Sequence, residues 1–212
     1  MQKGNRLVLA INIIMLLLAT VLIGFIVTIL VLGDPTNRMV SCISTLALYL
    51  LPVLLKWLLK LKIPASLWVI YFVFVTLGAF CGSCLNLTHT LQGFDKVQHS
   101  MWGYISCFVG LYYLCATKEF EKVNVFTVIL LFLGISLATA GLWELLEFAG
   151  DNLLGQTAQG KPVGGIVPVN DAMFDILCHT CGSIVFTIHF CLDRCLHKNL
   201  GITWVINDFS KK

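Results

Sequence analysis

Long apolar runs separated by short polar segments are the dominant pattern along the chain. A bilayer-crossing helix needs about 20 apolar residues, and five runs reach about that length, four of them uncharged and the last interrupted only by Asp175. A sixth, shorter run holds Pro52 and is flanked by lysine and arginine; a proline is tolerated in lipid because neighbouring helices satisfy the carbonyl that it frees. The pattern predicts six spans, at about residues 7–32, 40–58, 64–84, 98–116, 123–146 and 172–192.

The composition agrees with a membrane location and excludes a soluble globular protein. Of the 212 residues, 58% are hydrophobic and 12% charged, whereas soluble domains carry about 25% charged residues. So few charges do not cover the surface of a water-soluble globule. Six spans leave no room for a separate soluble domain. We therefore expect an all-α fold, a polytopic transmembrane helical bundle forming one membrane domain over residues 1–212, with no nucleic-acid motif.

The lysines and arginines predict the orientation of this bundle. With six spans both termini share one side of the membrane, and that side collects eleven cations against three on the other. Lysine and arginine accumulate on the cytoplasmic side, so both termini are predicted to be cytoplasmic, in a multi-pass protein of a bacterial plasma membrane. The short basic tail after Leu192 is expected to rest on the anionic inner leaflet.

The acidic residues gather on the opposite, outer side. Seven acids and three cations give that side a net charge of −4, and eleven cations with four acids give the inner side +7. Orientation rules do not require acids outside, so this excess is a functional clue. Three outer helix ends each carry acids or histidines three or four residues apart, on one helix face: Asp95 and His99; Glu144, Glu147 and Asp151; Asp171, Asp175 and His179.

Burying these groups in the membrane is costly and requires partners. At 1.5 Å per residue, His179 lies roughly 12 Å along the helix from Asp171, and an ionisable side chain in hydrocarbon normally faces the bundle interior and is paired. Lys96, Lys161 and the histidines are too few to neutralise the acids. Shared protons, a water-filled vestibule or a bound cation would do so. The predicted metal ligands are Asp95, His99, Glu144, Glu147, Asp175 and His179.

Simpler causes account for parts of this pattern. Acids in a first helical turn favour the helix dipole, which explains Asp95 and Asp171 without a function, although Glu144 and Glu147 are expected near a helix C-terminus. All of the acids can instead be solvated loop residues. His99 and His179 can each be packing histidines. Each of the three helix ends carries its acids or histidines in one row along a helix face, called a stripe below. The agreement of these three stripes favours a site over the simpler causes.

The outer loop and the cysteines offer two further hypotheses. The glycine-rich loop of residues 150–170 joins two of the stripes, so it is either a lid over the site or a plain surface loop. The Cys81/Cys84 and Cys178/Cys181 pairs are spaced like thiol oxidoreductase or metal-binding motifs. Cysteine is also a small residue suited to helix contacts in lipid, and five scattered cysteines favour that simpler role.

At the stripes the chain resembles the YjdF-like bacterial membrane proteins and, more distantly, the VanZ-like proteins. The similarity lies in an ordered set of short segments covering about the last 120 residues: 95–99, 144–147, 155–158 and 171–175, followed by Gly182. The resemblance implies a multi-helix membrane protein of unestablished activity. The chain has Glu-x-x-Glu where VanZ-like proteins favour an acid followed by a glutamine, and it lacks their arginine before the last acidic motif, so glycopeptide resistance is not carried over.

Three function classes remain open. The first is a membrane enzyme, using metal-assisted or acid–base chemistry on a lipid or cell-envelope substrate, with Glu144, Glu147, Asp171 and Asp175 as catalytic residues. Its cofactor would be a divalent metal ion. The second is a cation- or proton-coupled transporter, which is less favoured because the middle of each span lacks acids. The third is a structural protein in which the acids brace helix ends.

Overall fold

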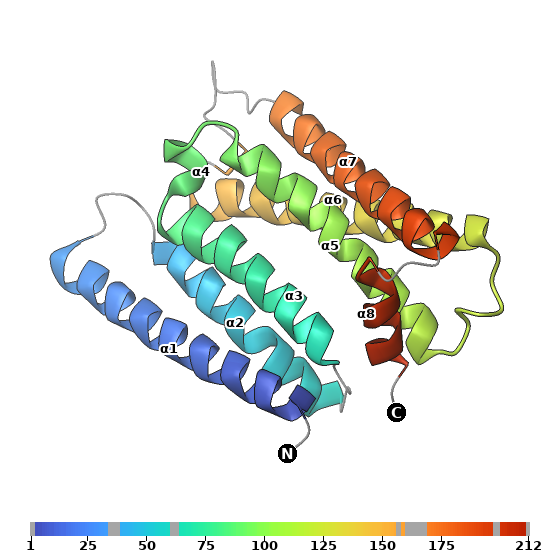
Figure 1. The fold of residues 1–212 in the computed structure, drawn as a ribbon. Helices are drawn as coiled ribbons and strands as arrows, with labels where there is room; N and C mark the ends of the chain where they lie inside the picture. Colours follow the sequence, from blue (N-terminus) through green and yellow to red (C-terminus); the bar gives the residue numbers. More distant parts are fainter. Residues whose placement is uncertain are drawn as a thin grey trace. The chain divides into compact units, whose positions relative to one another are not determined.

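The computed structural model describes residues 3–33, 39–59, 64–155, 158–159, 169–196 and 200–210. Within these residues every regular element is helical (Figure 1), which confirms the all-α prediction. The chain divides into two compact units, Met1–Asp95 and Lys96–Lys212. The division falls in the first turn of one helix, so Asp95 is described below with that helix.

The first unit is built on three long antiparallel apolar segments (Figure 1). These are α1 (Lys3–Leu32), α2 (Met39–Leu59), and α3 (Ala65–Val75) with its direct continuation, the π-helix η1 (Thr76–Cys84), after which a short α4 (Leu87–Thr90) leads onward. Pro52 lies inside α2 without ending it. Two hydroxyls join the segments: Tyr49 Oη bonds Thr76 Oγ1 at 3.1 Å, and Tyr71 Oη donates to the Leu48 carbonyl at 2.6 Å.

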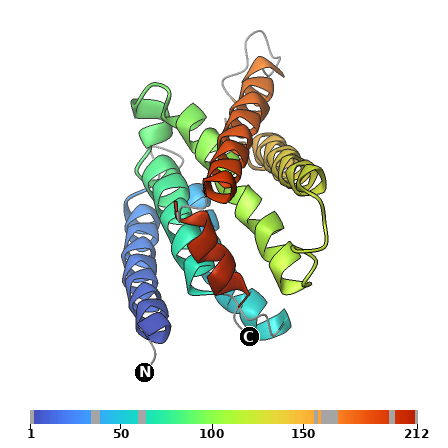
Figure 2. The same ribbon diagram turned by 45° about the vertical axis from the view of Figure 1, so that its right-hand side comes forward.

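The second unit contains α5 (Phe94–Ala116), α6 (Val125–Leu154), α7 (Val169–Cys195) and α8 (Ile202–Phe209). Asn124 caps α6 by accepting a 2.8 Å hydrogen bond from Thr127 N, and Gly155 ends it in the left-handed conformation at φ 65°. Figure 2 shows α7 crossing α5. An aromatic cluster fills the unit's core, formed by Phe108, Phe132, Phe186 and Phe190.

Four of the predicted spans are long and apolar enough to cross a membrane, by length and composition: Leu9–Leu32, Ala65–Cys84, Val125–Leu154 and Val169–Cys195. The apolar part of α2, Met39–Leu55, is shorter. Helix α5 is long enough but is not among these four. The six-span count therefore remains a prediction for α2 and α5, as does the orientation of the termini.

The helices extend beyond the apolar runs that predicted them. Helix α5 begins at Phe94, α7 begins at Val169, and α6 continues through Asp151 to Leu154. Glu144 and Glu147 therefore lie inside α6, and the expectation that they occupy a helix C-terminus is wrong. The difference arises because hydropathy detects the part of a helix that lies in lipid, whereas hydrogen bonding continues the helix into polar residues.

Candidate functional site

The candidate site is positioned by a close crossing of α5 and α7 at two glycines. A Cβ at Gly103 would lie 1.9 Å from the His179 carbonyl oxygen, and a Cβ at Gly182 would lie 1.9 Å from the Ser100 carbonyl oxygen. The two backbones are thus in direct contact, an arrangement that small residues allow between membrane helices. From the crossing, His99 lies one turn away on α5. On α7, His179 lies one turn away and Asp175 two turns away, at the positions that face α5.

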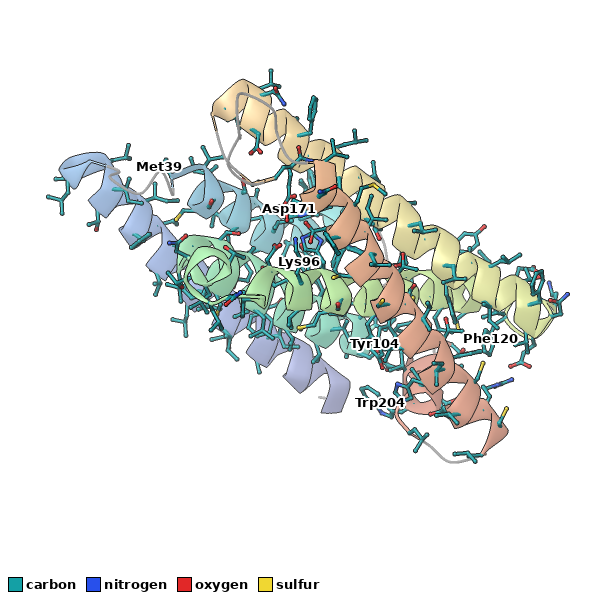
Figure 3. The ribbon with its side chains drawn as sticks, turned by 90° about the horizontal axis from the view of Figure 1, so that it is seen from above. Met39, Lys96, Tyr104, Phe120, Asp171 and Trp204 are labelled. Carbon is teal, nitrogen blue, oxygen red and sulfur yellow. The ribbon has the colours of Figure 1, made fainter. Side chains whose placement is uncertain are left out.

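Lys96 on α5 joins two aspartates of α7. Its Nζ donates to Asp171 Oδ1 at 2.7 Å and to Asp175 Oδ1 at 2.6 Å. The side chains of Lys96 and Asp171 are about one-third exposed, whereas that of Asp175 is 3% exposed. Figure 3 labels Lys96 and Asp171 at this end of the two helices. Lys96 therefore compensates the buried Asp175 carboxylate, which would otherwise be costly to bury.

Asp95, His99 and Asp175 form a three-residue group with metal-ligand chemistry. One ligand atom from each lies within 4.8 Å of the others. His99 Nε2 is 3.6 Å from Asp175 Oδ1, which is too long for a hydrogen bond. Two ligands of one zinc ion, each about 2.1 Å from it at the tetrahedral angle, lie about 3.4 Å apart. The His99–Asp175 spacing therefore resembles that of two ligands of one ion.

His179 is the most unusual polar side chain of the cluster. It is 1% exposed, and neither ring nitrogen has a hydrogen-bond partner among the described residues. Its ring contacts the edge of the His99 ring at a centroid distance of 5.5 Å and that of Trp102 at 6.5 Å. Nearly all buried polar groups in folded proteins are hydrogen-bonded, so a buried imidazole without a partner among the described residues sets His179 apart from the other side chains of the cluster.

The two glutamates of α6 lie in different surroundings. Glu144 is 8% exposed and within electrostatic reach of Asp175 and His99. Glu147 is half-buried and accepts a 2.8 Å hydrogen bond from Trp143 Nε1 in its own helix. Among the described residues, neither belongs to the close group of Asp95, His99 and Asp175. Glu144 borders the cluster, whereas the role predicted for Glu147 gains no support from its hydrogen bond.

Gln159, which the sequence did not single out, covers Glu144. Its Nε2 donates to the Glu144 carbonyl at 3.2 Å and to Glu144 Oε2 at 3.3 Å. Asp151 holds this segment by accepting from the Ala158 and Gln159 amides at 2.7 and 3.0 Å. The choice between a lid and a plain surface loop stays a prediction, because residues 156–157 and 160–168, including Lys161, lie outside the described residues.

The cysteine pairs do not form disulfides in the structure. All nine cysteines lie in described segments, and each is a thiol. Cys84 is buried in the first unit, where its sulfur lies 3.2 Å from Thr45 Oγ1. Cys178 is half-buried on α7, and Cys181 is exposed on the same helix. The structure thus gives the thiol oxidoreductase hypothesis no further support.

One family model matches the chain. Its description is "Predicted membrane protein (DUF2238)", and the match covers residues 13–194. Because this is well over half of the chain, the protein belongs to the DUF2238 family, which is the YjdF-like family, and that part of the resemblance is confirmed. The more distant VanZ-like similarity stays a prediction. Neither the curated proteins nor the solved structures include a significant match.

Proposed function

We propose that this member of the DUF2238 family is an integral membrane enzyme that uses a divalent metal ion at the α5–α7 cluster. One observation carries the proposal: Asp95, His99 and Asp175 present ligand atoms within 4.8 Å of one another, beside a buried His179 whose ring nitrogens have no partner in the described residues. Mixed carboxylate and imidazole ligands suit zinc, manganese or iron. Such an ion activates water or polarises a carbonyl or phosphoryl oxygen.

The cluster residues divide into binding and proton-transfer roles. Asp95, His99 and Asp175 are the proposed ligands, with His179 as the fourth. Glu144 is the proposed general acid or base, because it is a buried carboxyl near Asp175 and His99 whose Oε2 accepts a hydrogen bond from Gln159. A carboxyl in such a position takes or gives a proton in the reaction.

A membrane lipid or lipid-linked envelope molecule is the proposed substrate class. An open apolar hollow of about 380 Å³ follows α7 on the helix face opposite Asp171, Asp175 and His179; it is lined by Asn170, Met173, Phe174, Ile176, Leu177 and Thr180. Met173 and Phe174 are each 58% exposed. An acyl chain lying along this face would rest on the helix that carries Asp171 and Asp175, at the same depth as these two carboxylates.

Metal analysis of the purified full-length protein tests the proposal. The parent should retain close to one divalent ion per chain after dialysis, and a Glu144→Gln, Asp175→Asn double variant should retain far less. A Glu119→Gln, Glu121→Gln variant is the matched control, because it removes two acids from the α5–α6 connection, where Glu119 pairs with Lys122. If the parent binds no zinc, manganese or iron, or the double variant binds as much, the metal-site proposal is wrong.

A structural brace is the second candidate, and the Lys96 bridge favours it. Lys96 already pairs with Asp171 and Asp175 across two helices, so the cluster is partly neutralised without a metal. The same metal analysis separates the two functions: a brace would lose stability in the double variant without any difference in bound metal. Transport is less favoured, because the aromatic cluster of Phe108, Phe132, Phe186 and Phe190 lies between the polar groups at the two ends of α7.

The proposed topology has six spans in a bacterial plasma membrane, with cytoplasmic termini and an outward-facing cluster. The distribution of lysine and arginine supports it. Single cysteines at Ala158, which is exposed, and at Lys60, each in a background without native cysteines, test it in intact cells. A membrane-impermeant thiol reagent should modify the cysteine at position 158 and not the one at position 60. The reverse labelling would invert the topology.

A further inference from the structure

Lys96 occupies the position of a cation at the cluster. We propose that its ion pair with Asp175 and a divalent metal ion are mutually exclusive, so that Lys96 sets the metal affinity of the site. This inference rests on the metal site of the proposed function. It adds a resident competitor: the site alternates between a lysine-bound and a metal-bound state.

The first argument is that both cations need the same oxygen. Asp175 Oδ1 accepts from Lys96 Nζ at 2.6 Å and is also the oxygen 3.6 Å from His99 Nε2. A zinc ion between Asp175 and His99 would lie about 2.1 Å from this oxygen. An ammonium and a divalent ion on one oxygen would repel strongly at such a separation, because little water screens them there.

The second argument is that Lys96 has an alternative ion-pair partner outside the proposed ligands. Its side chain is 34% exposed and already contacts Asp171, whose side chain is 31% exposed. Asp171 lies outside the three-residue ligand group. Lysine carries its ammonium on a flexible four-carbon chain, so it can leave Asp175 and keep its pair with Asp171. Exchange of the two cations therefore requires a side-chain movement and no change in the helix crossing.

The third argument explains why both states are stable. Asp175 is 2% exposed, and a buried carboxylate without a counter-charge is strongly destabilising. In the lysine-bound state Lys96 supplies that charge, and in the metal-bound state the ion does. His179 has no hydrogen-bond partner among the described residues in the lysine-bound structure; it gains one only when the metal binds.

Zinc titration of the parent, Lys96→Gln and Lys122→Gln proteins tests the inference. Lys122 is an exposed lysine that pairs with Glu119, so its variant loses the same charge away from the cluster. We expect Lys96→Gln to bind zinc at least about tenfold more tightly than the parent, since a repulsive charge is removed, and Lys122→Gln to bind like the parent. Equal or weaker binding by Lys96→Gln, with zinc bound by the parent, overturns the inference and leaves the metal site intact.

Failure of the parent and both variants to bind zinc, manganese or iron overturns the metal site together with the inference. A second measurement needs no variant and so covers the case in which Lys96→Gln does not fold. An amine-reactive reagent, read out by peptide mass spectrometry, should label Lys96 more in the zinc-saturated parent than in the metal-free parent, because its ammonium is released. Lys122 is the internal reference, and unchanged or lower Lys96 labelling relative to it overturns the inference.

Discussion

Helix α7 carries a deeply buried polar side chain toward each end. The polar atoms of one have hydrogen-bond partners, and those of the other have none among the described residues. Asp193, at the C-terminal end, is 1% exposed. Its carboxylate accepts from the amides of Leu200, Ile202 and Thr203 at 2.8, 3.1 and 3.2 Å and from Thr203 Oγ1. These bonds hold the first turn of α8, whose amides have no partner within their own helix.

His179, toward the other end, is equally buried, at 1% exposed, yet its ring nitrogens have no partner within the described segments of the chain. Equal burial therefore does not make the two side chains alike. What distinguishes them is whether their hydrogen bonds are made. Asp193 is a completed structural contact, whereas His179 is stable in its position only if a ligand or the surrounding packing compensates it.

Substituting Gly182 should have the largest effect, because a larger side chain at this position would push apart α5 and α7, the two helices that meet near His179. An alanine Cβ would lie 1.9 Å from the Ser100 carbonyl oxygen, and backbone does not move aside cheaply. We expect Gly182→Ala to lower the free energy of unfolding by about 3 kcal/mol and to abolish zinc binding. Thermal unfolding in detergent measures it. Gly134→Ala is the control, since nothing lies within 4 Å of its Cβ; equal stability of the two variants would refute the crossing.

Removing Asp193 tests the end of α7 at which the buried polar side chain has its hydrogen bonds. Asp193→Ala leaves the Leu200 amide, two α8 amides and a hydroxyl without their acceptor, so we expect a loss of about 2 kcal/mol with zinc binding unchanged. Limited proteolysis should also cut near α8 more quickly. Glu119→Ala, which removes only an exposed pair with Lys122, should cost no more than about 0.5 kcal/mol. A loss of zinc binding in Asp193→Ala would show that the two ends are coupled.

Replacing His179 by leucine should separate stability from function. Since no hydrogen bond of its ring is lost, we expect His179→Leu to leave the free energy of unfolding unchanged or to raise it by up to about 1 kcal/mol. Zinc affinity should fall at least about tenfold.

His189→Leu is the matched control for this variant. His189 Nδ1 bonds Tyr104 Oη at 2.6 Å and its Nε2 contacts the Leu200 carbonyl at 3.1 Å, so its replacement should cost about 1 kcal/mol and leave zinc binding intact. Equal destabilisation by both variants would mean that His179 is structural.

Removing the side chain of Gln159 should have the smallest effect. Gln159→Ala deletes two hydrogen bonds to Glu144, and we expect a loss of about 0.5 to 1 kcal/mol. Carbodiimide labelling of Glu144, read out by mass spectrometry, should increase because the carboxyl is uncovered. Gln92→Ala, at an exposed position, should change neither quantity. Unchanged labelling of Glu144 would contradict a covering role for Gln159.

The sequence predicted the helical fold and which residues of one helix share a face. It did not predict which helices contact each other at the cluster. Spacings of three and four placed Asp171, Asp175 and His179 on one face of α7, because the helical period is regular. The crossing of α5 and α7 was not predicted, since Gly103 and Gly182 are two of 17 glycines and only their facing positions give them significance.

Contacts with loops were also beyond the sequence patterns. Gln159 reaches Glu144 because Asp151 holds the Ala158 and Gln159 amides, and that depends on where α6 ends. The tail was expected only to rest on lipid, yet Ile202–Phe209 is a helix with Ile202, Val205, Ile206 and Phe209 buried. Its periodicity spans too few residues to identify a helix without the Asp193 contacts.

The direct backbone contact at Gly103 and Gly182 has a consequence for how a substrate enters. Side-chain rotation does not separate helices whose main chains touch, so α5 and α7 move as one rigid piece and carry His99, Asp175 and His179 with them. On the α6 side, Gln159 reaches Glu144 through two side-chain hydrogen bonds, and its amide donates to Asp151. Under the proposed function, the α5–α7 crossing supplies the fixed part of the site and Gln159 supplies the part that a side-chain rotation uncovers.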